Sequence, residues 1–262
     1  MYSVDGVPLQ NPGMGWKFRG PSKPLSDLTV QRTSLRVPGL PGVVAGVEKT
    51  LEALDAPTLM LVVQTPRSAY EDVLALLSAG SVLSITDRPE KQAEYELLTT
   101  SYEGHGNADA IIDVTAVVRL PGVFWRDAED TTLTTDLTSD SVVADAWRMT
   151  GLVTDAVIRV RGTTGLRLIS SSAYVEYSPT LTSGSYFRYE CATGRAFVTT
   201  TDTWIGGTEV SGAVEDDGPG DKFGIYPWRP TPLESIARLR VASTARAAGA
   251  RVELRGRGAH LV

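Results

Sequence analysis

The pattern of apolar positions changes in the middle of the chain, at residues 110–130, AIIDVTAVVRLPGVFWRDAED. This segment starts with a β-branched run that is typical of a strand. It stops at Pro121 and Gly122, a pair that ends strands and opens turns. The preceding half has a mixed pattern, whereas the following half consists of short strands. We therefore interpret the segment as the exit from a first domain, residues 1–126, into a second, residues 127–262.

The first half contains one predicted helix, at residues 69–79. Ser68 followed by Glu71 fits a capping box at its start. Gly80 stands where a left-handed C-terminal cap is expected. The apolar residues fall on one helical face, as they do in a helix that packs on a sheet. This face consists of Tyr70, Val73, Leu74 and Leu77.

Strands are expected on both sides of this helix, so the first half should be an α+β domain, mostly sheet with one helix. Asp5 and Gly6 are a strong signal for a two-residue hairpin turn. The apolar runs at residues 59–64 and 111–118 predict strands that are buried on both faces. Residues 87–89 predict a turn. Further strands are expected at residues 28–37, with a bulge, and at residues 82–86, 95–103 and 110–119.

The second half has no convincing helical periodicity. Short strand-like segments alternate with turns that contain glycine, and this length and spacing indicate a β-sandwich. The whole chain is therefore predicted to be mainly β. The expected strands lie at residues 156–161, 166–171, 173–177, 185–190, 195–200, 222–226, 236–243 and 250–257.

Composition and charge narrow the possible functions. Of the 262 residues, 42% are apolar and 21% are charged, which is typical of a globular chain. The formal net charge of −6 argues against nucleic acid as the main partner, so no recognition of a nucleic-acid sequence is expected. The single cysteine, Cys191, excludes an internal disulfide. No signal peptide or membrane-length apolar run is visible, so we expect a soluble chain made in a cytoplasm, without a membrane partner.

Catalytic signatures are absent from the sequence. Neither histidine, His105 or His260, belongs to a known hydrolase or metalloprotease motif, and no cysteine-nucleophile motif surrounds Cys191. A pairing of Cys191 with His105, or of a serine with a histidine, is left open by the sequence. The plainer interpretation is a packed cysteine and a polar loop histidine. We therefore expect no enzyme activity and no catalytic, cofactor or metal site.

Two acidic clusters are the next candidates. Oxygen-rich loops can hold calcium, and paired carboxylates can hydrolyse glycosides. The spacing matches no calcium loop, and a hydrolase usually needs a cleft on a larger scaffold. Solvated loops are the plainer interpretation. The clusters are Asp127, Glu129 and Asp130, and then Glu215, Asp216, Asp217 and Asp221.

Aromatic residues of the second half offer a binding hypothesis. Flat apolar rings can stack on sugars, although aromatic side chains more often fill or cover a core. The rings in question are Trp147, Trp204, Tyr226 and Trp228.

Arginines alternate with apolar residues on the last two expected strands, which puts them on one face. That face could meet an acidic partner or simply water. These residues are Arg238, Arg240, Arg246, Arg251, Arg255 and Arg257.

Several local motifs, taken in order, resemble one protein family. They are Val7-Pro8-Leu9, RVPGLPG at residues 36–42, the helix from Ser68, Phe124-Trp125-Arg126-Asp127, the hairpin at residues 186–197, and KFGIYP at residues 222–227. Their order along nearly the whole chain resembles the distal tail proteins, or minor tail proteins, of phages with long non-contractile tails (siphophages).

The resemblance implies a fold and a role. The first half would form a hexameric ring that continues the tail tube, and the second half would be a galectin-like β-sandwich on the outside of that ring. The chain would join the tail tube protein to the tail-tip hub, the baseplate and the receptor-binding proteins of the virion. No galectin sugar motif is present, so sugar binding does not transfer. In the irregular segment at residues 11–24, Trp16 and Phe18 are expected as inter-subunit anchors.

Two rival functions come from other classes. A carbohydrate-binding adhesin module that recognises host cell-wall glycans would depend on the sandwich and on Trp147, Trp204 and Trp228. A cell-wall hydrolase would depend on the acidic clusters. An adhesin does not require the mixed first half, and the carboxylates stand in turns without a supporting scaffold. The sequence therefore favours a structural ring protein.

Overall fold

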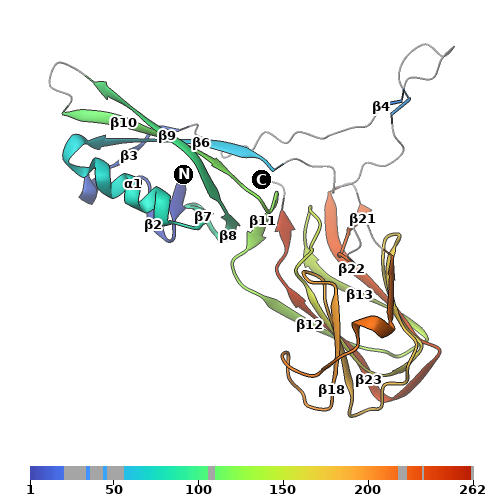
Figure 1. Ribbon diagram of the computed structural model, residues 1–262. Helices are drawn as coiled ribbons and strands as arrows, with labels where there is room; N and C mark the ends of the chain where they lie inside the picture. Colours follow the sequence, from blue (N-terminus) through green and yellow to red (C-terminus); the bar gives the residue numbers. More distant parts are fainter. Residues whose placement is uncertain are drawn as a thin grey trace. The chain divides into compact units, whose positions relative to one another are not determined.

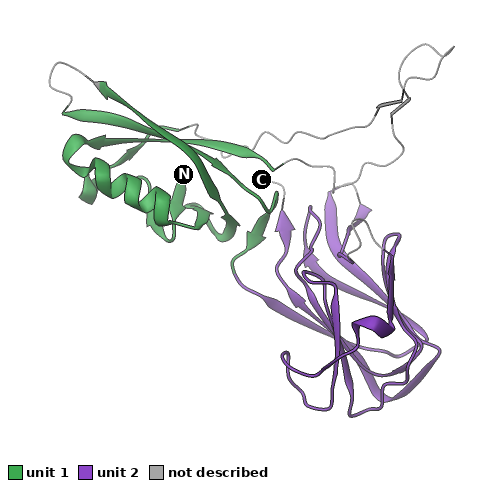
Figure 2. Cartoon of the chain, viewed as in Figure 1, with its two compact units in different colours: residues 1–128, 261–262 green, residues 129–260 purple. Residues whose placement is uncertain are grey.

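The chain forms two compact units, residues 1–128 with 261–262 and residues 129–260 (Figure 2). The expected boundary at residues 126 and 127 lies beside this division. The computed structural model describes residues 1–20, 34–35, 44–45, 56–105, 110–217, 223–231 and 233–260. Most of the strand expected at residues 28–37 falls outside the described residues.

Unit 1 is mainly β with one α-helix, as predicted (Figure 1). A four-stranded antiparallel sheet has the order β3-β6-β10-β9, and a second sheet includes β2-β1-β7-β8-β11. Its strands are β1 (Tyr2–Val4), β2 (Val7–Pro8), β3 (Lys17–Phe18), β4 (Ser34–Leu35), β5 (Val44–Ala45), β6 (Thr58–Pro66), β7 (Val82–Ile85), β8 (Arg88–Glu94), β9 (Glu96–His105), β10 (Ile111–Arg119) and β11 (Trp125–Asp127). Its helices are α1 (Tyr70–Ala79) and the 3-10 turns η1 (Pro12–Met14) and η3 (Arg67–Ala69).

The hairpin predicted at Asp5 and Gly6 is present between β1 and β2. Both residues have positive φ angles, 46° and 82°, as a tight two-residue turn requires. The Asp5 carboxylate also accepts a hydrogen bond of 2.9 Å from the backbone N–H of Val82. The turn predicted at residues 87–89 is shorter than expected, because Arg88 and Pro89 already belong to β8. The sequence RPEKQAE of β8 has almost no apolar alternation, so this strand was missed.

Strands β6 and β10 are present, but the prediction that both faces are buried is wrong. Burial alternates along each strand: Leu61 and Val114 are fully buried, whereas Met60 of β6 is 56% exposed. The buried face packs against α1, whose Val73 and Leu77 belong to the same core. The opposite face has no covering element among the described residues, so its apolar side chains stay open to solvent.

Helix α1 has the predicted apolar face, but its predicted caps are wrong. The N-cap position is Ala69, without a side-chain hydrogen bond, because Ser68 is taken up in the preceding 3-10 turn. Gly80 is extended, with φ −69° and ψ 152°, and not left-handed. A Cβ atom at position 80 would lie 2.3 Å from Val4 Cγ1. Close packing therefore explains this glycine.

Unit 2 is a sandwich of two antiparallel sheets, as predicted. The first sheet has the order β12-β23-β14-β17-β18-β19, and the second has the order β13-β22-β15-β16-β20, with β21 paired to β22. The strands are β12 (Thr131–Asp136), β13 (Ser141–Arg148), β14 (Val157–Thr164), β15 (Leu166–Ser170), β16 (Ala173–Tyr177), β17 (Tyr186–Glu190), β18 (Arg195–Thr199), β19 (Thr208–Glu209), β20 (Val214–Asp217), β21 (Pro227–Thr231), β22 (Glu234–Ala242) and β23 (Ala245–Gly256). The short strand β24 (Ala259–His260) is in neither sheet of the sandwich. One 3-10 turn, η4 (Ser211–Ala213), precedes β20.

The core of unit 2 lies between these sheets. Tyr177 of β16 stacks on Phe187 of β17, with ring centroids 4.7 Å apart, and so joins the two layers. The threonine-rich β12 and the acidic β20 were missed, since both are edge strands with mostly polar residues. The strand expected at residues 222–226 is instead a single bridge between Val153 and Ile225 within the described residues.

Candidate assembly and binding surfaces

The open face of the four-stranded sheet is the first candidate surface. Rows of directly opposed residues cross it, among them Met60–Val117–Thr99 and Val62–Thr115–Ser101. A third row is Gln64–Asp113–Glu103. The face therefore combines a few apolar side chains with hydroxyl and acidic groups.

The edges of this sheet are also available for contacts. At one edge, β9 pairs only with β10 among the described residues, and Leu98 of β9 is 49% exposed. At the other edge, β3 pairs with Val63 and Gln64 of β6 and leaves the start of β6 uncovered in the same part of the chain. Unpaired strand edges are ready-made sites for pairing with another chain.

Trp16 and Phe18, the expected inter-subunit anchors, are part of the packing of unit 1. Trp16 is 2% exposed and belongs to the unit's core, so its ring is unavailable to a neighbouring subunit in this conformation. Phe18 is half-buried and meets Tyr2 edge to face, with centroids 5.9 Å apart. An anchoring role is therefore not supported for Trp16, and Phe18 offers only part of its ring.

A row of charged and aromatic side chains crosses the outer face of the first sheet of unit 2. The register places these residues side by side on five strands, whereas their neighbours along each strand are mostly core residues. The row consists of Glu253, Arg159, Arg188, Phe197 and Glu209.

Arg159 is the centre of this row, although it is only 2% exposed. Its Nε donates a hydrogen bond of 2.8 Å to Glu253, and its Nη2 pairs with Asp202. The guanidinium lies 4.4 Å from the ring of Trp204 and 4.7 Å from that of Tyr186. The hydrogen bond from Arg159 lowers the pKa of Asp202 below its usual value. The burial of this charge is thus offset by two carboxylates and two aromatic faces.

Arg188 lies directly beside Arg159 and is also buried. Its guanidinium is 3.1 Å from the carboxylate of Glu190 and 4.5 Å from the ring centroid of Phe197. Its Nε and Nη1 atoms have no hydrogen-bond partner within the part of the chain that the structure describes. Sequence inspection did not single out either arginine, because β14 and β17 were assigned only as strands.

The prediction that the late arginines share one face is wrong. Consecutive strands β22 and β23 belong to different sheets, so Arg238 and Arg251 lie on opposite layers of the sandwich. Most of these arginines also pair with carboxylates of their own unit. The pairs are Arg238–Asp145, Arg246–Asp140, Arg251–Glu253, Arg255–Asp130 and Arg257–Asp155.

The tryptophans considered for sugar stacking face different sides of the sandwich. Trp204 is stacked on Arg159, in the first sheet. Trp228 of β21 has its ring 3.0 Å from the guanidinium carbon of Arg238, in the second sheet. Trp147 points toward the first sheet, since a Cβ at Gly256 would lie 3.2 Å from its ring. The structure therefore does not gather these rings into one sugar site.

The catalytic and metal candidates remain dispersed. Cys191 is buried, and this burial raises the pKa of its thiol well above the usual range. Among the described acidic residues, Asp127 pairs with Lys91, and Asp216 accepts a hydrogen bond of 3.1 Å from the hydroxyl of Tyr189. No group of three potential metal ligands occurs within the described ranges. In the same ranges, no helix is both long enough and apolar enough to cross a membrane.

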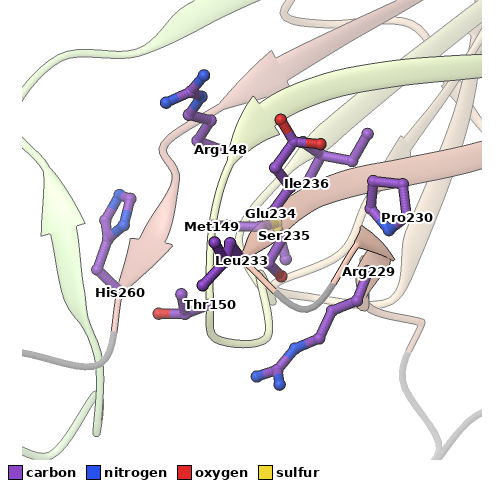
Figure 3. Close-up of a pocket in the computed structure, with 10 residues that line it drawn as sticks. All are labelled: Arg148, Met149, Thr150, Arg229, Pro230, Leu233, Glu234, Ser235, Ile236 and His260. Atoms are coloured by element: carbon purple, nitrogen blue, oxygen red, sulfur yellow. The ribbon is translucent and has the colours of Figure 1, made fainter.

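A pocket of about 410 Å³ lies at one end of the sandwich (Figure 3). It is lined by residues from β13, β21, β22 and β24 and from the segments beside them, which are far apart in the sequence. The backbone N–H of Met149 donates to the carbonyl of Ser235 at 3.0 Å and ties two of these segments together. The pocket is not evident in the sequence, because only the pairing of distant strands brings its lining residues together. The lining residues are Arg148, Met149, Thr150, Arg229, Pro230, Leu233, Glu234, Ser235, Ile236 and His260.

Comparison with known proteins bears on the fold. No protein-family model and no curated protein sequence matches the chain. Among solved structures, the chain is similar to the Dit protein of phage SPP1, a paradigm of the hub adsorption apparatus in phages that infect Gram-positive hosts. This match has 10% sequence identity and a TM-score of 0.53, and it covers 98% of this chain and 93% of that chain.

Two structures of the phage p2 baseplate in its activated conformation, one with Sr and one with Ca, also match. Each has 9% identity and covers 92% of this chain and 90% of that chain, with TM-scores of 0.38 and 0.36. The match to the SPP1 Dit protein confirms, at the level of the fold, the resemblance seen in the sequence: over both of its units, the chain has the fold of that phage distal tail protein.

Proposed function

We propose that this protein is a structural, non-enzymatic component of a phage tail tip. In this proposal it forms a hexameric ring that joins the tail tube to the tip hub and to the receptor-binding proteins, and its location is the virion tail. The likeness of the fold to the SPP1 Dit protein over almost the whole chain supports this role. The observation that carries it is the four-stranded sheet of unit 1, with one open face and two incompletely paired edges.

Such a sheet suits assembly into a ring. A head-to-tail contact between β9 of one copy and the open start of β6 in the next would use unlike surfaces of the two copies. Contacts of this kind close into a ring when the rotation between subunits closes. Added strands would also satisfy the backbone N–H and C=O groups that each single copy leaves exposed at its edges.

The layering of unit 1 supports one orientation of this sheet in the ring. Helix α1 packs on one face of the sheet and makes unit 1 wider on that side. The wider side suits the larger, outer circumference of a ring. The open face would then line the channel. The carboxylates of Glu103 and Asp113 on this face would repel phosphates, so that nucleic acid could pass without binding.

The ring is tested by negative-stain imaging and light scattering of concentrated full-length protein, with and without tail tube protein. We expect rings of six subunits with a central channel. Leu98→Lys together with Tyr102→Lys adds two charges to β9, as natural edge strands do to prevent pairing. This double variant should leave only monomers, with a small loss of thermal stability because Tyr102 gives up its edge-to-face contact with Tyr70.

Ile205→Lys is the matched control, because Ile205 is an exposed apolar residue of unit 2. Rings should persist in this control. A wild-type protein that stays monomeric even with the tail tube, or rings of another subunit number, would contradict the proposal.

A further inference from the structure

The pocket at the end of unit 2 has a charge that differs from that of the rest of the chain. The whole chain has a formal charge of −6, whereas the lining holds two arginines and one glutamate, a formal charge of +1 with His260 neutral. Arg148 and Arg229 have no ion-pair or hydrogen-bond partner for their side chains among the described residues, unlike most of the late arginines. The two guanidinium groups are therefore available to a ligand.

The arrangement of the lining residues indicates which chemical groups a ligand would need and in what order. Figure 3 shows Arg148 and Arg229 on either side of Leu233, with Met149 behind it and His260 and Thr150 along one side. Charged groups thus flank an apolar centre. An extended ligand with carboxylates beside an apolar group would match this order, since a guanidinium fork matches the geometry of a carboxylate.

Two features of the free pocket are unfavourable unless something covers them. Leu233 is 98% exposed at the turn between β21 and β22, and the removal of a large apolar side chain from water lowers the free energy. The hydroxyl of Ser235 is buried without a hydrogen-bond partner within the described part of the chain. Buried polar groups in folded proteins are normally paired, so this hydroxyl offers a contact to a ligand backbone.

From these contacts we propose that the pocket binds a short, extended acidic segment of a partner protein, with an apolar side chain over Leu233 and carboxylates at Arg148 and Arg229. Its volume is within the range of ligand pockets and holds only a few residues. Nucleic acid is a poorer match, because the lining includes Glu234 and lacks the basic stripe that a phosphate backbone requires. The proposal does not depend on ring formation, because every lining residue belongs to unit 2.

The first test exposes immobilised full-length protein to a soluble library of capped pentapeptides. We expect retained peptides to combine aspartate or glutamate with a large apolar residue. Binding should weaken as salt rises from 50 to 500 mM, because salt screens the contacts of partly exposed charges. Retention of neutral or basic peptides, or of none at millimolar concentration, would overturn the proposal.

The second test measures the affinity of the best retained peptide for single variants. Arg148→Gln and Arg229→Gln should each weaken binding about tenfold or more, as expected for the loss of a charged hydrogen bond. Leu233→Ser should weaken it by a smaller factor. The control is Arg167→Gln, an exposed arginine on β15 that pairs with Glu176, and it should bind as wild type does.

Melting curves verify that each variant is folded, which is expected because the two arginines and Leu233 are exposed. Equal affinity for wild type and both arginine variants would disprove the assignment. Full displacement of the peptide by inorganic phosphate at low millimolar concentration would also disprove it, since it would indicate a simple anion site.

Discussion

The two units of this protein differ in the polar groups that they bury. In unit 1 the buried polar residues in the described ranges carry only hydroxyl groups, and two of them, Ser3 and Ser84, bond to each other at 2.7 Å. Unit 2 buries the charged groups of Arg159, Arg188 and Glu253. The burial of a hydroxyl group costs little folding free energy when the group is hydrogen-bonded, whereas a buried charge requires a partner in a fixed position.

This difference shows which interactions hold each unit together. Unit 1 is held by apolar packing and leaves a sheet face and edges open, which suits a unit that completes its pairing with other copies. Unit 2 places its charged network on the outer face of a complete sandwich and so depends less on neighbours. The following predictions test this contrast, starting with the largest expected effect.

Removal of one charge partner from unit 2 should have the largest effect. In Glu253→Ala, the buried Arg159 loses its Nε partner, and such a loss typically costs 3–5 kcal/mol of folding free energy. We expect about 3 kcal/mol, because Asp202 still pairs with Arg159. Urea denaturation, with hydrogen exchange to separate the units, measures this. The control is Glu209→Ala, which breaks the exposed pair with Arg195 and should leave the midpoint of urea denaturation almost unchanged. Equal losses of folding free energy in the two variants would show that the buried charges do not matter more than the exposed ones.

A single methyl group should disturb the apolar packing of unit 1. Gly80→Ala places its Cβ 2.3 Å from Val4 Cγ1 and 2.7 Å from the carbonyl oxygen of Leu76. Overpacking of this kind costs about 1–3 kcal/mol. The control is Gly122→Ala, where no atom lies within 4 Å of the added Cβ, so that stability should stay equal or rise slightly. If Gly80→Ala melts at the wild-type temperature, close packing is not the reason for this glycine.

Alkaline pH should weaken unit 1 through Tyr95. Its burial, and to a lesser degree the nearby Asp5, raises the pKa of Tyr95 to about 12. The protonated hydroxyl donates a hydrogen bond of 2.8 Å to the carbonyl of Leu77. Because the folded pKa lies above the ordinary value of 10, the contribution is complete below pH 10 and is lost as the pH rises toward 12.

Melting temperatures of wild type and Tyr95→Phe between pH 9 and pH 12 measure this effect. The variant should be slightly less stable at pH 9 but should lose less stability above pH 10. Burial also raises the pKa of Tyr2 and Tyr189, so part of the alkaline loss remains in the variant. Parallel curves for the two proteins would exclude Tyr95 as the source.

Local patterns in the sequence determined the elements and the class of fold. The apolar spacing of Val73 and Leu77 specified α1, and Asp5 with Gly6 specified the first hairpin, because these signals act over a few neighbouring residues. The short strands after Asp130 specified a sandwich. The order of the parts was enough to indicate the distal tail protein fold, which the match to the SPP1 Dit protein confirms.

Only the tertiary structure decided what each residue contacts. Trp16 was expected as an inter-subunit anchor but lies in the core of unit 1, and Gly80 serves close packing instead of a left-handed cap. The arginines of the last two long strands lie on different layers of the sandwich, because β22 and β23 belong to different sheets. Arg148 and Arg229 became neighbours of one pocket although 80 residues separate them in the chain. The register of distant strands sets such contacts, and the pattern within any one strand records only which of its two faces is apolar.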